Sequence, residues 1–339
     1  MAFVLAAFAL FAGAGAFAQS PTQDPAKEAL PAKVAIYTAT GGTTVALPLM
    51  GALKKGWPGT EVELIEWKNL DDLKGLALSG KGDFWLGHLE SLALAAGRGA
   101  PAVLVSVTAW KKFYFVSGKL EFEPGSAPVR PKDLEALSAY LKKKKLTLAT
   151  APQNSPAQGI VDKLGALGGP SFELEGLPPQ QVLLELATGR RPCALLPEPM
   201  ATVALSKNPD LGILANLEEE YAKMTKGLPR LPQAGVAVNA AFAAKHPGLV
   251  RELATLMRES AEEMKNMSPA EIVSLLPPSV AENLGRENLE NSLKRDPIMA
   301  VSAADAFGEI EAFLCVATPE LCRDGKLDKA LDGFVHGAR

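Results

Sequence analysis

Polar and aromatic side chains stand directly after several short apolar runs of the sequence. After the first run, at 33–38, comes a cluster of hydroxyls and glycines. At the start of a helix such a cluster offers hydroxyl and backbone N–H donors to an anion. A helix cap with flexible glycines would have the same composition. We expect the cluster to contact a ligand, because open α/β sheets bind ligands beyond the carboxyl ends of their strands. It consists of Thr38, Thr40, Gly41, Gly42, Thr43 and Thr44.

The same rule selects residues at the ends of four later runs and at the start of a fifth. They are His88, Glu90, Trp110, Gln153, Asn154, Ser155, Glu198 and Gln233. His88 could hydrogen-bond a ligand or be satisfied within the fold, and Trp110 could line a cleft or belong to the core. Glu198 could bind a ligand amine or amidine, or only cap the helix that follows. In the first role it would suit a zwitterion or a cationic heteroaromatic ligand, whereas bare nitrate would favour Lys or Arg.

Reactive groups are scarce, which argues against catalysis. The chain has 3 Cys and 3 His, little material for a structural zinc site. The motifs HExxH, GxSxG and GxGxxG are absent. The glycine spacing at 51–56 is followed by Trp57 and Pro58, where a phosphate loop needs Lys and Ser or Thr. Cys193 lies in an apolar run without a nearby base, so we expect a buried thiol. We expect no enzyme, no cofactor and no metal.

Composition and charge narrow the class of protein further. The 339 residues carry 35 Lys and Arg against 38 Asp and Glu, and 47% of them are hydrophobic. This excludes wholesale disorder, and the near balance of charge argues against a broad basic face for nucleic acid. We interpret the lysine run at 142–145 as the solvated end of a helix. The length suits one large domain or two lobes.

The first 18 residues predict export. They carry no charge, and Ala16-Phe17-Ala18 fits the small-x-small cleavage pattern of a secretory signal peptide, although no basic residue precedes the apolar run. The alternative is a membrane anchor, for which 17 apolar residues after Met1 fall short of the roughly 20 that span a bilayer. No Cys precedes Cys193, so no lipid-attachment cysteine follows the signal. We expect a free periplasmic protein. In an oxidising compartment, Cys315 and Cys322 could close a small disulfide loop.

Strand and helix patterns alternate along the body of the chain. A βαβ order of this kind implies mostly parallel sheets covered by helices. A similarity in sequence pattern between residues 76–88 and 186–197 suggests two similar lobes. The hinge candidates between them lie near 117–127 and 227–233. The expected strands are 33–38, 61–66, 84–87, 102–108, 146–150, 171–174, 193–196, 211–215 and 234–238. The expected helices include 45–55, one capped by Asn69, 90–96, 132–145, 155–167, 179–188, 199–207 and 247–265.

Four phrases carry a family resemblance over about residues 33–270. They are Leu76–Leu86 with Gly97–Pro101; Pro131–Leu134; Thr188–Pro199; and Gly235–Val250. In their order and spacing they resemble the type-2 periplasmic substrate-binding proteins, specifically the NitT/TauT-like group for nitrate, sulfonate and taurine that feeds ABC importers. The missing basic residues at the start and a long helical C-terminal tail depart from that family.

The resemblance implies an α/β, two-lobed periplasmic-binding-protein type 2 fold with a ligand cleft between the lobes. Lobe 1 would comprise 33–117 plus 234–339, and lobe 2 would comprise 118–233. It implies a monomeric exported receptor that captures a small polar or charged molecule and delivers it to an ABC-transporter permease. The ligand would belong to the nitrate, sulfonate, taurine or thiamine-precursor class. The alternatives are an enzyme of the same fold, of the desulfinase or pyrimidine-precursor synthase type, and a ligand-sensing domain that presents to a signalling receptor.

Overall fold

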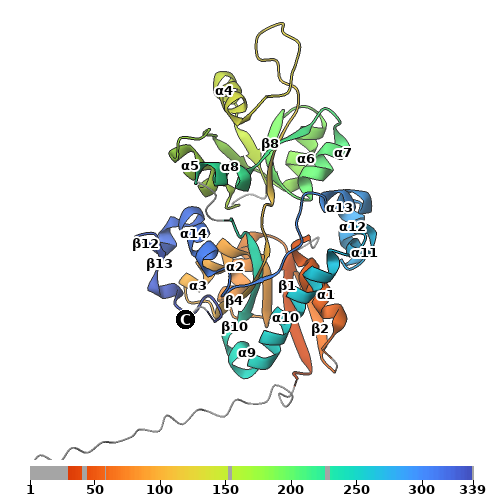
Figure 1. The fold of residues 1–339 in the computed structure, drawn as a ribbon, viewed down its shortest axis with the longest axis vertical. Helices are drawn as coiled ribbons and strands as arrows, with labels where there is room; N and C mark the ends of the chain where they lie inside the picture. The colour runs from red at the N-terminus through yellow and green to blue at the C-terminus, as the bar shows by residue number, and fades with distance from the viewer. Residues whose placement is uncertain (1–29, 40–43, 58, 152–154, 226–229, 338–339) are drawn as a thin grey trace, which may run out of the picture.

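Two β-sheets, each flanked by helices, lie one above the other in the molecule (Figure 1). The computed structural model describes residues 30–39, 44–57, 59–151, 155–225 and 230–337. We call each sheet with the helices around it a lobe. Among the described residues, no helix has both the length and the apolar composition needed to cross a membrane.

The sheet of the first lobe has six strands in the order β11-β4-β10-β3-β1-β2. Strand β1 pairs in parallel with β2 and β3, whereas β10 is antiparallel to both β3 and β4, and β11 is antiparallel to β4. Four strands therefore run in one direction and β10 and β11 run against them. The strands are β1 (Lys33–Ala39), β2 (Glu61–Trp67), β3 (Phe84–His88), β4 (Ala102–Ala109), β10 (Ala234–Asn239) and β11 (Val301–Ser302).

The sheet of the second lobe repeats this plan with five strands in the order β7-β6-β8-β5-β9. Strand β6 pairs in parallel with β7 and β8, and β5 is antiparallel to β8 and β9. Each lobe thus inserts one reversed strand, β10 or β5, between two strands that run the other way. The expectation of two mostly parallel, helix-flanked sheets is confirmed as two mixed sheets. The strands are β5 (Phe113–Ser117), β6 (Leu148–Thr150), β7 (Leu174–Gly176), β8 (Cys193–Pro197) and β9 (Gly212–Asn216).

Helices cover the faces of both sheets (Figure 1). The first lobe carries the short helix η2 (Thr44–Ala46), α1 (Leu47–Lys55), α2 (Leu70–Leu78), α3 (Leu89–Gly97), α9 (Ala240–Lys245) and α10 (Pro247–Met264). The second carries α4 (Leu134–Lys144), α5 (Ala157–Ala166), α6 (Pro179–Ala187), α7 (Met200–Lys207) and α8 (Leu217–Met224). The C-terminal part holds α11 (Pro269–Val273), α12 (Pro278–Leu284), α13 (Arg286–Ser292), α14 (Phe307–Ala317), η3 (Pro319–Leu321), the hairpin β12 (Cys322–Arg323) and β13 (Lys326–Leu327), and η4 (Lys329–Leu331).

Helix α2 shows how local sequence specifies such an element. The side chain of Asn69 accepts hydrogen bonds from the backbone N–H groups of Asp71 and Asp72, at 3.0 and 2.9 Å. This satisfies two donors of the first turn and confirms the predicted cap. Leu73 on the inner face is fully buried. Just past the helix, Gly80 has a φ of +64°, which a glycine adopts without a steric penalty.

The chain crosses between the lobes at two places. The first crossing is residues 110–112, because β4 ends at Ala109 and β5 begins at Phe113. The second lies between α8 and β10. The predicted boundary after residue 117, and the hinge near 117–127, are wrong because β5 pairs with β8 and β9 of the second lobe. All five residues of β5 are buried. The strand therefore lacks the alternation that marks a half-buried strand in a sequence.

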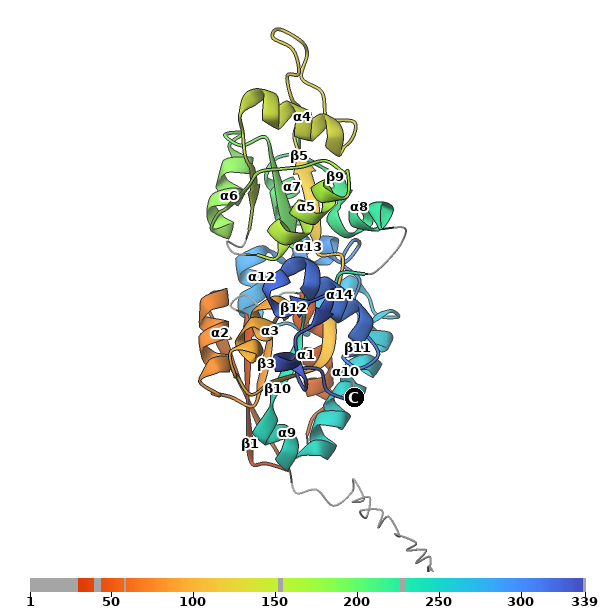
Figure 2. The ribbon, with the colours of Figure 1, turned by 90° about the vertical axis from the view of Figure 1, so that its left-hand side faces the viewer.

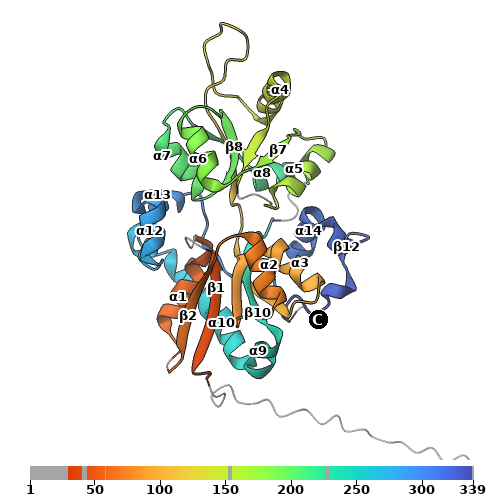
Figure 3. The same ribbon diagram turned by 180° about the vertical axis from the view of Figure 1, so that it is seen from behind.

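The C-terminal segment packs on both lobes rather than extending from one. Helix α13 contacts α7 of the second lobe, while α14 contacts α5 of the second lobe and α3 of the first. Figure 1 shows α11 to α13 on one side of the molecule and α14 on the other, and Figures 2 and 3 show α12, α13 and α14 at the level between the sheets. Cys315 of α14 and Cys322 of β12 form a disulfide bond with their Cα atoms 5.4 Å apart.

Candidate functional site

The strand ends selected in the sequence meet where the two lobes face each other. In the first lobe, Ala234 at the start of β10 pairs with His88 and Ala109, the last residues of β3 and β4. In the second lobe, the start of β5 pairs with the ends of β8 and β9 in the same way. Only residues 110–112 separate β4 from β5. The carboxyl ends of both parallel sets therefore point into one interlobe region.

Three predicted residues, one in β1 and one in each crossing, have unpaired polar atoms near this region. Thr38, Trp110 and Gln233 are buried. Their Oγ1, Nε1 and Nε2 atoms have no hydrogen-bond partner within the described part of the chain. Buried polar atoms are nearly always hydrogen-bonded to protein, water or a ligand, so such a set needs a partner. In the second lobe, the hydroxyls of Thr150 and of the predicted Ser155 have the same character.

His88 and Glu90 lie together at the start of α3. His88 Nδ1 is 3.4 Å from Glu90 Oε1, and the Glu90 carboxylate is buried with its Oε2 atom unpaired among described residues. The backbone N–H of Leu89 donates to the carbonyl of Gln233 at 3.1 Å, which joins this pair to the second crossing. The first lobe thus also offers a buried acceptor just after the end of β3. The remaining predicted residues, Thr40, Gly41, Gly42, Thr43, Gln153 and Asn154, lie outside the described residues and stay predictions.

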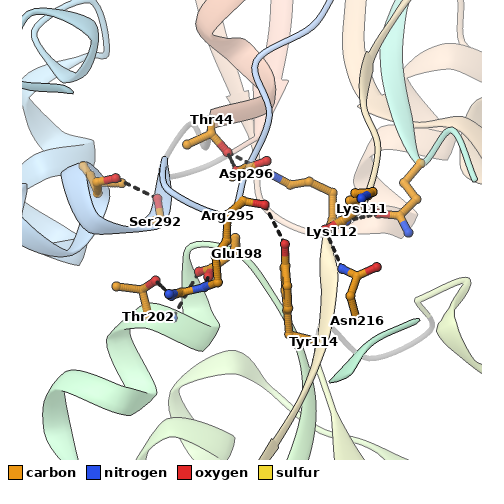
Figure 4. A network of polar contacts seen from close by, with 12 residues as sticks. Thr44, Lys111, Lys112, Tyr114, Glu198, Thr202, Asn216, Ser292, Arg295 and Asp296 are labelled. Atoms are coloured by element: carbon orange, nitrogen blue, oxygen red, sulfur yellow. Dashed lines mark hydrogen bonds and ion pairs between the residues drawn. The ribbon is translucent and has the colours of Figure 1, made fainter. Parts of the chain in front are cut away.

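Glu198 has both carboxylate oxygens engaged by the protein (Figure 4). Its Oε2 accepts from the backbone N–H of Thr202 at 3.0 Å, which caps α7, and its Oε1 accepts from Arg295 Nε at 2.8 Å. The capping alternative left open by the sequence is therefore present. The hypothesis of a ligand amine on Glu198 loses its basis, because the carboxylate already faces a cation from the C-terminal segment.

A buried ion pair that the sequence analysis missed lies beside this contact. Lys112 of the first crossing pairs with Asp296, and their side chains are only 7% and 3% exposed. Lys112 Nζ also donates to Thr44 Oγ1 at 2.7 Å, and Thr44 in turn donates to Asp296. The predicted residue Thr44 thus lies on an internal ion pair rather than on an open face (Figure 4).

Adjacent residues of the segment between α13 and β11 therefore reach both lobes. Asp296 binds Thr44 of the first lobe, whereas Arg295 binds Glu198 of the second. The hydroxyl of Tyr114, in β5, donates to the Arg295 carbonyl at 2.5 Å, and burial raises the pKa of Tyr114 well above its usual range. No sequence signal marks these contacts, since 97 residues separate Arg295 from Glu198 and 184 separate Asp296 from Lys112.

A second carboxylate fastens the two crossings to each other. Oε2 of the buried Glu218 accepts from the backbone N–H of Lys111 in the first crossing, at 3.3 Å, and from that of Leu231 in the second, at 2.8 Å. Burial raises the pKa of Glu218 above its usual value. In addition, Gln233 Oε1 accepts from the Lys112 N–H at 3.2 Å. The two connections between the lobes thus form one hydrogen-bonded unit.

The second crossing also joins the C-terminal segment. The guanidinium of Arg230 lies 4.9 Å from the ring centroid of Trp110 and forms an ion pair with Glu309 of α14 at 2.8 Å. This cation–π contact covers the face of Trp110 and leaves its Nε1 edge without a partner among the described residues. The ring is therefore held in one orientation, and Trp110, 1% exposed, belongs to a hydrophobic core cluster, as the second alternative from the sequence expected.

Comparison with known proteins finds the same architecture in solved structures. An ABC transporter protein of Parabacteroides distasonis matches with a TM-score of 0.65 at 17% identity, over 91% of this chain and 99% of that one. The alkanesulfonate-binding protein of Xanthomonas axonopodis, bound to MOPS, gives 0.62 at 16% identity, over 88% and 97%. A Candida albicans gene product with the generic periplasmic-binding-protein fold gives 0.56 at 13% identity, over 90% and 96%. This chain has the periplasmic-binding-protein fold. No protein-family model and no curated protein matches it.

In this periplasmic-binding-protein fold, the one free thiol among the described residues is placed away from the interlobe region. Cys193 is the first residue of β8, whereas Pro197 at the other end of the strand faces the first crossing. Burial raises the pKa of the Cys193 thiol to about 12. Thiolate chemistry needs a lowered pKa and a nearby base, so this thiol is suited to packing rather than to attack on a substrate. The described residues also contain no cluster of three His, Cys, Asp or Glu side chains that could hold a metal.

Proposed function

We propose that this chain is the exported solute-binding receptor of an ABC importer, of the NitT/TauT-like group. It captures a small polar or charged molecule between its lobes and delivers it to a permease. The fold supports this proposal, and so does the nature of two structural neighbours, one an ABC transporter protein and the other an alkanesulfonate-binding protein. Nitrate, sulfonates, taurine and thiamine precursors are the candidate ligands.

One observation carries the proposal: polar atoms that are buried and have no partner among the described residues lie near the strand ends of both lobes. They belong to Thr38 in the first lobe, Trp110 and Gln233 in the two crossings, and Thr150 and Ser155 in the second lobe. We expect a solute held between the lobes to supply partners for these atoms. Closure around it would use the crossings at 110–112 and 225–233, in the manner of hinged binding proteins.

Export is a separate part of the proposal. The uncharged segment 1–18 would be cleaved after Ala18, and the mature chain would lie in the periplasm. The disulfide between Cys315 and Cys322 supports this location, because such bonds persist in oxidising compartments and are rare in the cytosol.

A binding screen with two matched tryptophan variants tests the function. The mature protein is screened by thermal shift and calorimetry against nitrate, alkanesulfonates, taurine, bicarbonate and pyrimidine thiamine precursors. A ligand at 100 times its Kd stabilises the folded state by about 2.7 kcal/mol, enough for a clear shift in Tm. Trp110→Phe keeps an aromatic side chain but removes the Nε1 donor, so we expect weaker binding of the best ligand.

Trp57→Phe is the control for this screen. Trp57 Nε1 is also buried without a partner among described residues, but it lies between α1 and β2 and packs against Phe84 in the core of the first lobe. We expect this variant to bind as the wild type does. Equal losses in both variants, or no binding of any compound in the panel, would contradict the proposed receptor.

A further inference from the structure

Arg295 is held along one edge of its guanidinium. Its Nε donates to Glu198 Oε1 at 2.8 Å, and its Nη2 donates to Thr202 Oγ1 at 2.5 Å (Figure 4). Glu198 is itself fixed, since its side chain is 0% exposed and its second oxygen caps α7. The main chain of Arg295 is fixed as well, by the hydrogen bond from Tyr114 to its carbonyl. The guanidinium is therefore positioned before any ligand arrives.

The other edge of the same guanidinium is open. Arginine has five N–H donors, and only two of them have acceptors here among the described residues. The Arg295 side chain is 31% exposed, so the remaining donors reach solvent. Arg191 offers a contrast, because all three of its nitrogens bind within the second lobe, to Glu185, Thr147 and Glu175. Each nitrogen of Arg191 thus has a partner in the fold, whereas Nη1 of Arg295 has none among the described residues.

The location of Arg295 places this open edge between the lobes. Glu198 follows the carboxyl end of β8, and the residue after Arg295, Asp296, binds Thr44 of the first lobe. Lys112 is a second cation near this point, but its ammonium is buried against Asp296 and Thr44. Arg295, by contrast, combines a fixed geometry with available donors.

We propose that the open edge of Arg295 binds the anionic head group of the solute, a carboxylate or a sulfonate, with Glu198 as the positioning residue. Two parallel N–H donors match two oxygens of such a group, and a guanidinium is better suited to this than an ammonium. This inference rests on the proposed receptor function and reverses the charge that the sequence suggested for the site. It also assigns a role to the C-terminal segment, which supplies the ligand-binding cation.

Small oxyanion probes test this assignment whichever solute the receptor carries. Calorimetry measures the binding of methanesulfonate and acetate, with dimethyl sulfone and acetamide as uncharged counterparts. We expect the wild type to bind the anions and not the uncharged compounds. Arg295→Gln should weaken anion binding on the order of tenfold to a hundredfold. Lys294→Gln removes one positive charge from the neighbouring exposed residue, whose Nζ contacts Asn291, and should leave binding unchanged.

Arg295→Lys covers the case in which Arg295→Gln fails to fold. It keeps a charge for Glu198 but loses the planar pair of donors, so we expect a folded protein that binds the anions more weakly. Anion binding that is equal in the wild type and both Arg295 variants would overturn the inference, and so would an absence of anion binding in the wild type. If a solute from the screening panel still binds in either case, the receptor function stands and only the role of Arg295 fails.

Discussion

The buried pair of Lys112 and Asp296 predicts a strong, coupled effect on stability. Asp296→Asn keeps an amide oxygen beside the Lys112 ammonium but removes its counter-charge, and the Thr44 hydroxyl carries no charge to replace it. Lys112→Met leaves the Asp296 carboxylate with only the Thr44 hydroxyl from this cluster. Both side chains are at most 7% exposed, and breaking such a pair from one side costs about 3–5 kcal/mol. That is a large part of the roughly 5–15 kcal/mol that holds a folded protein together.

A double variant tests whether the two charges depend on each other. Lys112→Met with Asp296→Asn leaves no unpaired charge, so it should be less destabilised than the sum of the single variants, by about 1–3 kcal/mol. Urea unfolding followed by tryptophan fluorescence measures all three free energies. The exposed pair of Lys33 and Glu63, 50% and 46% exposed, is the control and should show no measurable coupling. Single variants as stable as the wild type, or strictly additive effects, would refute a buried and mutually dependent pair.

Three further predictions concern other parts of the chain. The raised pKa of Glu218 means that the folded state binds this proton more tightly than the unfolded state, so its contribution to stability is complete below the unfolded-state pKa and is lost as pH rises through the folded-state pKa. Glu218→Gln should therefore gain stability relative to the wild type as pH rises from 4 to 7, measured by urea unfolding. A difference in unfolding free energy that stays constant over this range would contradict this. Reduction of the disulfide between Cys315 and Cys322 should cost about 2.5 kcal/mol for so short a loop; unchanged unfolding in reductant would argue against a stabilising role. Mass spectrometry of the protein exported by a bacterial host should find Gln19 as its first residue, and an intact Met1 would exclude cleavage after Ala18.

Features set by neighbours in the sequence were predictable. The cap of α2 needs only Asn69 and the N–H groups two and three residues later. The strand-end rule selected Trp110 and Gln233 because each lies next to a clear apolar run, and their contact with a ligand stays a prediction. By contrast, β5 is buried along its whole length and follows β4 after three residues. Its sequence therefore lacks the alternation of apolar and polar residues, and no long loop separates it from β4, so it was not predicted as a strand of its own.

Contacts between distant segments were not predictable. The charge of Glu198 suggested a cationic ligand, and its partner Arg295 lies 97 residues away in a tail without strand-end character. The ion pair of Lys112 with Asp296 spans 184 residues. Nothing in a single sequence pairs one particular Lys with one particular Asp among 38 acidic residues. The cation beside Glu198 could therefore be identified only from the folded structure.

The most direct test of the central proposal is a crystal structure with the best ligand of the screen. We predict that the ligand lies between the lobes and contacts residues from the strand ends of both, with Trp110 Nε1 and Ser155 Oγ among its partners. Density for the ligand on the outer face of one lobe, or contacts confined to a single lobe, would contradict a receptor that closes around its solute.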